Sequence, residues 1–259
     1  MSKTALITGA SSGIGLEMAK IFANENIDLV ITARREERLQ DLKSELEETQ
    51  SIQVYIFVSD LSDRDAPSQL YNFCKENNLQ IDYLINNAGI GDYGFFWESN
   101  WDKTETMLDL NIKSLTHLTR LFLPDMIERN SGRVMNVAST ASFQPGPLMS
   151  VYYASKHYVL AFSEALANEL SDHGITVTVL CPGPTKSEFQ ENANMLKSKL
   201  MDRLPMPDSR EVAEYGYKSM MNGKRVAVHG VTNKIMSKLV VLFPRKWVTA
   251  IVRKVQERN

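Results

Sequence analysis

Cysteine is scarce in this 259-residue sequence, and long hydrophobic runs are missing. The two cysteines, Cys74 and Cys181, lie outside any spacing typical of metal ligands, so we expect neither a disulfide framework nor a metal site. A reducing compartment is therefore favoured. The longest apolar run near the end, LVVLF at 239–243, is far shorter than the roughly 18 residues that a membrane-spanning helix needs.

An excess of positive charge is missing as well. The chain has 29 Lys and Arg against 31 Asp and Glu, and its formal net charge is −2. Because nucleic-acid-binding proteins usually present a basic surface, we expect no nucleic-acid partner. No basic and apolar leader is evident either, since the strand-like KTALITGA begins at residue 3. These features together predict a cytoplasmic protein.

What the sequence does contain is an alternation of short β-branched runs with amphipathic stretches of helical length. Hydrophobic residues make up 43% of the chain, which is enough for a sizeable core. The runs are TALIT (4–8), DLVIT (28–32), QVYIFV (53–58), IDYLIN (81–86), RVMNVAS (133–139), ITVTVL (175–180) and, more weakly, RVAVHG (225–230). Strands that alternate with helices predict an α/β fold with a doubly wound, mostly parallel sheet.

No linker, low-complexity tract or internal repeat divides the chain, which predicts a single domain over residues 1–259. Leucines at helical spacing predict a helix over residues 36–49. The alternation lapses after residue 183, and we expect the Met- and Lys-rich residues 186–206 to form a mobile substrate loop.

A basic amphipathic extension is predicted for residues 231–259, which have seven basic residues and one acidic residue. Its apolar stripe at helical spacing consists of Trp247, Val248, Ile251, Val252 and Val255. Such a helix rests on a membrane surface, contacts a lipid-like substrate, or packs against its own body or a second subunit. The sequence leaves these alternatives open, with packing the more common outcome.

The glycine-rich segment TGASSGIG (8–15) directly follows the first strand. Gly9, Gly13 and Gly15 allow a tight turn and the close approach of a phosphate, and the helix that follows offers free N–H groups and a positive dipole end. A plain glycine turn is the alternative. The position after the first strand of a doubly wound sheet favours a Rossmann fold that binds a dinucleotide.

The second strand ends at Arg34 and Arg35, where an acidic residue would bind the ribose hydroxyls of NAD. Two guanidinium groups suit a 2′-phosphate, which they can bind through several charge-assisted hydrogen bonds. The alternative is a pair of solvated arginines. We predict NADP(H) as the cofactor.

Several motifs occur together in the order typical of one family. They are TGASSGIG, NNAG (86–89), Asn111, Ser139, the Tyr152–Lys156 pair and CPGP (181–184). On these motifs the chain, over roughly residues 3 to 190, resembles the short-chain dehydrogenase/reductase family, and its length and glycine spacing resemble the compact single-domain branch. One small departure is Ala138-Ser139-Thr140, where the family often has two serines.

The resemblance implies roles for individual residues. The implied cofactor-binding residues are Gly9, Ser11, Ser12, Gly13, Ile14, Gly15, Arg34, Arg35, Asp60, Leu61, Asn87, Ala88, Gly89, Tyr152, Lys156, Pro182, Gly183 and Thr185. The implied catalytic residues are Asn111, Ser139, Tyr152 and Lys156. Asp60 would bind the adenine amine, and Pro182, Gly183 and Thr185 would border the nicotinamide. The resemblance also implies a homodimer or homotetramer.

The spacing of Tyr152 and Lys156 predicts a tuned phenol. A tyrosine pKa of about 10 is too high for acid–base work near neutrality. Lys156 follows four residues later on the same helical face, and an ammonium ~4 Å away would lower the pKa by ~2 to 3 units. Tyr153, three residues before Lys156, remains a physical rival, and the family pattern selects Tyr152. His157 is expected to be an ordinary helix residue.

Ser139 and Asn111 allow two interpretations each. Ser139 follows a strand and could donate to a substrate oxygen as negative charge develops there, or it could simply cap the strand end. Asn111 interrupts an amphipathic pattern. The resemblance implies that it bulges the helix and holds a water linked to Lys156, whereas taken alone it reads as a satisfied core asparagine.

Three segments are expected to wall a substrate pocket: 91–99, 141–151 and 186–206. Their apolar residues are Tyr93, Phe95, Phe96, Trp97, Phe143, Leu148, Met149, Phe189, Met195, Leu196 and Met201. We predict an NADP(H)-dependent oxidoreductase that interconverts a carbonyl and an alcohol on a small hydrophobic ketone or aldehyde. The alternatives are an NADPH-binding sensor or scaffold without turnover and a peripheral membrane protein.

Overall fold

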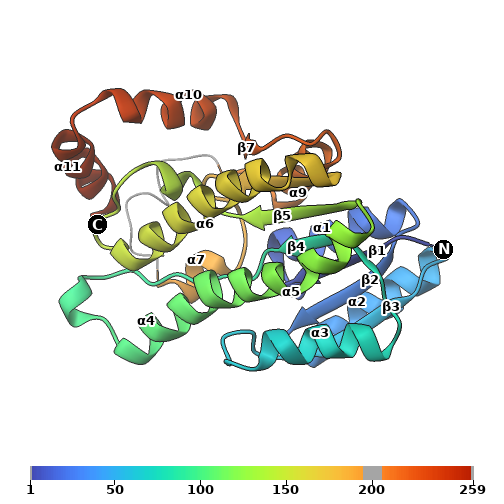
Figure 1. The fold of residues 1–259 in the computed structure, drawn as a ribbon. Helices are drawn as coiled ribbons and strands as arrows, with labels where there is room; N and C mark the ends of the chain where they lie inside the picture. Colours follow the sequence, from blue (N-terminus) through green and yellow to red (C-terminus); the bar gives the residue numbers. More distant parts are fainter. Residues whose placement is uncertain (1, 195–205, 258–259) are drawn as a thin grey trace.

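The computed structural model describes residues 2–194 and 206–257, and its centre is a parallel sheet of seven strands (Figure 1). The strand order is β3-β2-β1-β4-β5-β6-β7. The strands are β1 (Thr4–Thr8), β2 (Asp28–Ala33), β3 (Val54–Val58), β4 (Ile81–Asn86), β5 (Gly132–Val137), β6 (Ile175–Cys181) and β7 (Val226–Val228). The predicted doubly wound α/β fold is confirmed. β5 ends two residues earlier than predicted, and β7 has only three residues.

Helices cover both faces of the sheet. One face holds α1 (Gly13–Asn24), α2 (Glu36–Thr49) and α9 (Ser209–Met221), and the other holds α3 (Ala66–Glu76), α5 (Leu115–Glu128) and α6 (Ser150–Glu169). The strands are apolar on both sides because side chains alternate along them. In β1, for example, Ile7 packs with the α1 side and Leu6 with the α3 side.

The sheet positions a site where its strand order reverses. β1 pairs with β2 on one side and with β4 on the other, and both pairings are parallel. Loops that leave neighbouring strands in opposite directions open a crevice at the carboxyl ends of such strands. The segments that follow β1, β4, β5 and β6 all begin at this edge of the sheet.

The helix that crosses this edge is interrupted. Between α4 (Trp101–Leu108) and α5, residues Asp109–Ser114 form one π-helical segment, η2. A π-turn widens the backbone ring and is frequent at functional sites. Asn111 lies inside it, so the predicted bulge of the helix at this asparagine is confirmed.

After β7 the chain forms the extension, which consists of α10 (Val231–Leu239), η6 (Val240–Leu242) and α11 (Arg245–Gln256). In Figure 1 it lies along the upper edge and the left side of the molecule, and α11 ends next to the N-terminal end of α6. Val248 and Val252 are buried, while Trp247 and Ile251 are 63% and 64% exposed. The predicted stripe is therefore divided, because one edge of α11 packs on the protein's own body and the other faces solvent.

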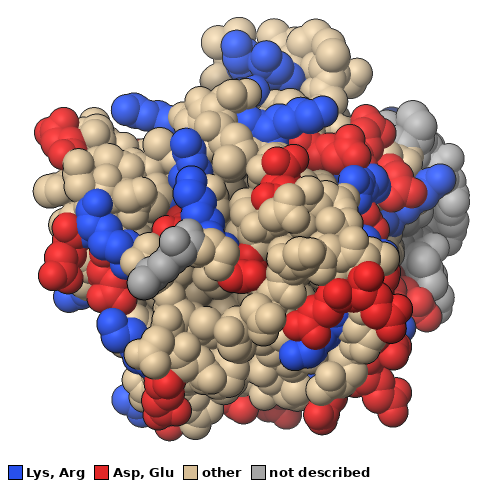
Figure 2. Space-filling model, turned by 90° about the vertical axis from the view of Figure 1, so that its right-hand side faces the viewer, with Lys and Arg blue, Asp and Glu red and all other residues tan. Residues whose placement is uncertain are grey.

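Neither cysteine is paired: Cys74 and Cys181 are both buried free thiols. Within residues 2–194 and 206–257, no group of His, Cys, Asp or Glu is arranged to hold a metal ion. Over the same ranges, every helix is too short or too polar to cross a membrane. Figure 2 shows basic and uncharged side chains at the top of the molecule, while acidic side chains are spread over the rest of this face among further basic ones.

Candidate active site

A cavity of about 710 Å³ follows the carboxyl ends of the strands. It is lined by eighteen of the residues predicted from the sequence: Gly9, Ser11, Ser12, Gly13, Ile14, Arg34, Arg35, Asp60, Leu61, Asn87, Ala88, Gly89, Ser139, Tyr152, Lys156, Pro182, Gly183 and Thr185. Two predicted residues, Gly15 and Asn111, lie behind the lining. The sequence motifs thus meet around one space although they span more than 170 residues.

The glycine loop has the backbone that its sequence predicts. Gly9 and Gly13 have φ angles of +68° and +57°, which other residues adopt only with strain. Gly15 is required for a different reason, because a Cβ there would lie 2.3 Å from the carbonyl oxygen of Gly9. α1 begins at Gly13 with no acidic residue in its first turn. The loop is therefore compact, and a positive helix end borders the cavity.

Arginine side chains line the cavity near the glycine loop. Arg34 Nη1 lies 3.4 Å from Asp60 Oδ2. Arg35 donates to Ser11 Oγ of the glycine loop and forms an ion pair of 2.7 Å with Glu188. The same carboxylate contacts Arg38. Arg34 and Arg35 thus line the cavity, and Arg38 is joined to Arg35 through the shared Glu188 carboxylate.

The arginine side chains of this cluster help to lower the pKa values of two carboxyl groups. Hydrogen bonds from Arg38 and Arg35 lower the pKa of Glu188. Burial alone would raise the pKa of Asp60, but hydrogen bonds from Ser62 and the charge of Arg34 outweigh it and the pKa is lowered. Sequence analysis missed Glu188 and Arg38. The available signal for Arg38 was its position one helical turn after Arg34 and Arg35.

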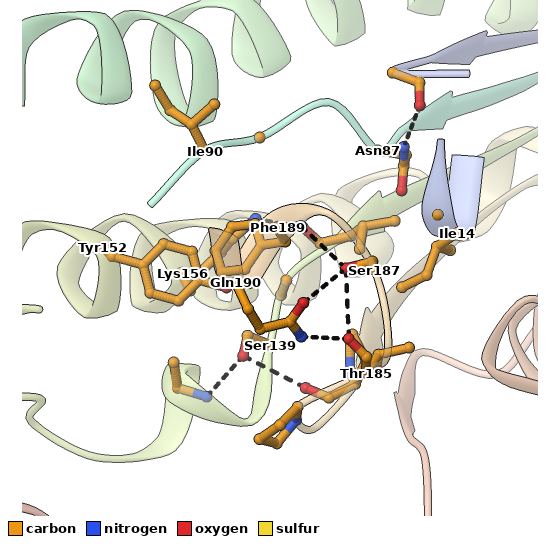
Figure 3. A pocket seen from close by; sticks show the side chains of 18 of the residues that line it. Ile14, Asn87, Ile90, Ser139, Tyr152, Lys156, Thr185, Ser187, Phe189 and Gln190 are labelled. Atoms are coloured by element: carbon orange, nitrogen blue, oxygen red, sulfur yellow. Dashed lines mark hydrogen bonds between the residues drawn. The ribbon is translucent and has the colours of Figure 1, made fainter. Parts of the chain in front are cut away.

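Tyr152 and Lys156 lie one turn apart on α6 and both face the cavity (Figure 3). The Lys156 amine is 5.7 Å from the centroid of the Tyr152 ring. It donates a hydrogen bond of 2.8 Å to the carbonyl oxygen of Val137 at the end of β5. Lys156 is only 5% exposed. The predicted shared face of the helix is confirmed.

The predicted direction of the Tyr152 pKa is wrong for this structure. Burial raises the pKa of Tyr152 to about 12, and the neighbouring Ser139 side chain offsets this only in part. Burial also lowers the pKa of Lys156 to about 8. The spacing determines that the two residues share one face of the helix. It does not determine whether desolvation or the lysine charge has the larger effect on the tyrosine pKa. Here the lysine amine donates its hydrogen bond to the backbone carbonyl oxygen of Val137.

Ser139 follows β5 by two residues and caps the short helix η3 (Thr140–Phe143). Its hydroxyl accepts a hydrogen bond from Ala141 N and donates to Pro182 O. Figure 3 shows it in the same cavity as Tyr152. Ser139 is therefore both a cap and a hydroxyl beside the phenol, so the two interpretations of its role are compatible.

Asn111 is buried in the π-helical segment and makes three hydrogen bonds. Its amide pairs with both backbone groups of Ile90, and its Nδ2 also donates to Ser155 Oγ. A Cβ on Gly89 would lie 3.2 Å from Asn111 Oδ1 and 3.4 Å from the Lys156 amine. Asn111 thus fixes the segment that follows β4 beside the lysine, as a satisfied asparagine in contact with the site.

Tyr153, the rival phenol, is held by the extension. Its hydroxyl accepts a hydrogen bond from Gln256 Nε2 of α11, and burial raises its pKa. Its ring meets that of Tyr152 edge to face at 6.1 Å. His157 Nδ1 contacts the carbonyl oxygen of Tyr153 within the helix. Tyr153 is engaged in packing while Tyr152 lies between Ser139 and Lys156.

The substrate end of the cavity differs from its predicted walls. Phe143, Met149 and Phe189 line the cavity as predicted, and the Phe189 ring lies 5.3 Å from that of Tyr152 (Figure 3). Phe96 and Trp97 are exposed and do not line it. The remaining predicted wall residues are Tyr93, Phe95 and Leu148, which pack behind the lining, and Met195, Leu196 and Met201, which lie outside the described residues.

Residues of the extension complete this end instead. Met236, Ile251, Val252, Val255 and Gln256 all line the cavity. α11 is anchored there by Val248 and Val252, which pack in one cluster with residues such as Met149 and Tyr153. The apolar stripe in the sequence indicated that α11 packs on something. The structure shows that Val248 and Val252 pack on the protein's own body, which was one of the alternatives left open.

Comparisons with known proteins agree with this geometry. A family model described as short chain dehydrogenase matches residues 3–197. An uncharacterized oxidoreductase from Staphylococcus saprophyticus is 30% identical over 89% of this chain and 96% of its own. A short-chain dehydrogenase from Sphingobium yanoikuyae, solved with NADPH, is 28% identical with a TM-score of 0.84 over 99% of both chains.

A second solved neighbour is the bulky-bulky ketone specific alcohol dehydrogenase from Comamonas testosteroni. It is 27% identical with a TM-score of 0.78, and the alignment covers 94% of this chain and 95% of that chain. Another solved neighbour was crystallised in complex with NAD. The structures similar to this chain therefore include complexes with either nicotinamide cofactor.

Proposed function

This chain belongs to the short-chain dehydrogenase family, and on that premise we propose that it is an NADP(H)-dependent oxidoreductase that interconverts a carbonyl and an alcohol on a small hydrophobic ketone or aldehyde. The observation that carries the proposal is the meeting of Ser139, Tyr152 and Lys156 with the glycine loop around one cavity. A cytoplasmic location and a homodimer or homotetramer remain predictions.

The residues present fit the cofactor. The loop from Gly9 to Gly15 leaves no side chain on its tightest turn and ends at a helix N-terminus, which suits a pyrophosphate. Arg34, Arg35 and Arg38 supply positive charge for a 2′-phosphate, the group that NADP has and NAD lacks. When bound, the nicotinamide supplies or accepts the hydride.

The protein's own side chains would transfer the proton that the reaction requires. With a pKa of about 12, Tyr152 holds its proton at neutral pH and can donate it to the substrate oxygen as negative charge develops. Ser139 lies beside the phenol and can donate a second hydrogen bond to the same oxygen. Lys156, whose pKa is about 8, can carry or release a proton near neutral pH and return it to the phenol.

An apolar substrate is supported by the wall opposite the phenol. Phe143, Met149, Phe189, Ile251 and Val252 present carbon surface there. Apolar walls with a few polar groups bind hydrophobic ligands and orient a single reactive group. The structural neighbour from Comamonas testosteroni acts on bulky-bulky ketones, which agrees with such a substrate.

The test follows consumption of NADPH and NADH with a panel of aliphatic, aromatic and steroid-like ketones and aldehydes. We expect turnover with at least one hydrophobic member and a preference for NADPH. Tyr152→Phe should lower kcat by about 10³-fold, because the proton donor is lost, while NADPH binding measured by fluorescence is kept.

Tyr158→Phe is the matched control, because Tyr158 lies on the same helix but outside the cavity. This variant should keep its turnover. NADPH binding without turnover on any compound would support the scaffold alternative. A loss confined to Tyr153→Phe would assign the chemistry to the neighbouring phenol.

A further inference from the structure

The extension presents an unusual amount of exposed apolar surface. Fifteen large hydrophobic side chains are exposed in the described part of the chain, and nine of them lie between residues 231 and 251. These nine, the apolar surface of the extension, are Val231, Ile235, Met236, Leu239, Val241, Leu242, Phe243, Trp247 and Ile251. Scattered exposed apolar residues are normal, but nine of them within one short segment indicate an interaction surface.

The extension is nevertheless ordered against the body by its other side. Val248 and Val252 are buried, Tyr93 and Tyr153 hydrogen-bond Gln256, and Arg253 lies 4.8 Å from the centroid of the Phe95 ring. By contrast, α10 buries none of its nine residues. The apolar surface is therefore held in place by α11 while facing away from the protein's own core.

Charge separates the extension from the rest of the chain. Residues 231–259 contain seven basic residues and one acidic residue, a net charge of +6. The other residues contain 22 basic and 30 acidic residues, from the totals of 29 and 31, which gives −8. Figure 2 shows basic and uncharged side chains together at the top of the molecule, where α10 lies in Figure 1.

This combination identifies one kind of partner. A second copy that docks through the same surface would place two groups of positive charge against each other, because a two-fold contact pairs identical patches. An anionic lipid bilayer complements both features, since its headgroups attract Lys and Arg while its interface accepts Trp, Phe and Leu. We propose that the extension docks on the surface of an anionic membrane.

The geometry of docking follows from the order of residues. Leu242, Phe243 and Trp247 surround Pro244 at the turn between η6 and α11, and they are 75%, 54% and 63% exposed. Arg245 and Lys246 follow at once as the first two residues of α11. The apolar side chains would enter the interface, and the adjacent cationic groups would remain at the headgroups.

The docking surface adjoins the cavity. Met236 and Ile251 belong to the apolar surface of the extension and also line the cavity. A hydrophobic carbonyl compound dissolved in the bilayer would thus meet the substrate end of the cavity beside the docking surface. This route rests on the proposed function, whereas the docking itself does not depend on it.

The experiment is sedimentation of the full chain with vesicles, without cofactor or substrate. One set of vesicles is phosphatidylcholine alone, and the other contains about a third phosphatidylserine. We expect most of the protein to sediment with the anionic vesicles and to stay in the supernatant with the neutral ones. Raising the salt concentration should release it, because the Debye length falls from ~8 Å at physiological ionic strength to ~3 Å at 1 M.

Two variants and a matched control test the named residues. Phe243→Ser with Trp247→Ser, and Arg245→Glu with Lys246→Glu, should each weaken partitioning by about tenfold or more. Trp101→Ser removes a tryptophan that is 61% exposed on the body, and it should partition like the wild type. Circular dichroism checks that each variant is folded.

The proposal is overturned if the wild type stays in the supernatant with anionic vesicles or sediments equally with both compositions. It is also overturned if the variants change only self-association, measured by sedimentation velocity, because the surface would then bind a second copy. Since no substrate is present, vesicle binding succeeds or fails independently of whether the protein turns over any carbonyl compound.

Discussion

The two ends of the cavity are built in different ways. The cofactor end is polar and comes mostly from segments that directly follow β1, β2, β3 and β4, within the first ninety residues, with Glu188 added from a later segment. The substrate end is apolar and brings together residues far apart in the chain, such as Tyr93, whose hydroxyl donates to the backbone carbonyl oxygen of Gln256, 163 residues later. Local backbone rules determine the first end, and long-range packing determines the second.

Lys156 lies where the two ends meet, and its burial gives the largest expected change in stability. Its pKa is about 8 in the fold against an ordinary 10.5, so between these values the unfolded chain binds a proton that the folded lysine has released. Stability from this group therefore rises with pH through that window and is lost as the pH falls through 8.

The measurement is urea unfolding of the wild type and of Lys156→Met from pH 7 to 10. The free energy of unfolding of the wild type should rise relative to the variant by about 2 kcal/mol between pH 8 and 10. Cys74 and the tyrosines titrate in both proteins, and Cys181, which is coupled to Lys156, is buried with a pKa raised to about 12, above the range measured. A difference that is flat with pH would mean that the folded lysine keeps its ordinary pKa.

At the substrate end, α11 allows a direct comparison of its two faces. Val252→Ala removes a buried side chain that lines the cavity, and should lower the free energy of unfolding by about 1.5 kcal/mol. Ile251→Ala, on the neighbouring position with 64% exposure, should change it by less than about 0.5 kcal/mol. Equal decreases in the free energy of unfolding of the two variants, measured by urea unfolding, would show that both faces of α11 are packed to the same extent.

At the cofactor end, Glu188 is expected to compete with a 2′-phosphate for Arg35 and Arg38. Glu188→Gln should tighten NADPH binding by about threefold, the range of an exposed ion pair, and leave NADH binding unchanged. Glu191→Gln, three residues later in the short helix α7 (Phe189–Asn192), is the matched control. Fluorescence titration measures both cofactors, and weaker NADPH binding in Glu188→Gln would mean that the carboxylate supports the site.

The sequence predicted the backbone of the glycine loop and the shared face of α6 because single residues determine them. Positive φ angles at Gly9 and Gly13 follow from glycine itself, and the i, i+4 spacing of Tyr152 and Lys156 fixes their common face. The break in the helix at Asn111 was also predicted. Arg38 and Glu188 were missed because their contact joins α2 to a loop 150 residues later.

The substrate end was predicted less well because apolar residues do not specify their partners. Phe96 and Trp97 resemble Phe189 in the sequence, yet they point to solvent. The direction of the Tyr152 pKa was wrong because the extent of burial depends on packing from several segments at once. In both cases the missing information is which distant elements come together.

The position of α11 in the chain has a consequence for synthesis. Every strand of the sheet and every segment of the glycine loop leaves the ribosome before this helix does, and domains generally form from the N-terminus as they emerge. A nascent chain could therefore assemble the glycine-loop end of the cavity first and gain the wall that α11 supplies only afterwards. A chain interrupted before residue 231 would have a cavity that lacks this side.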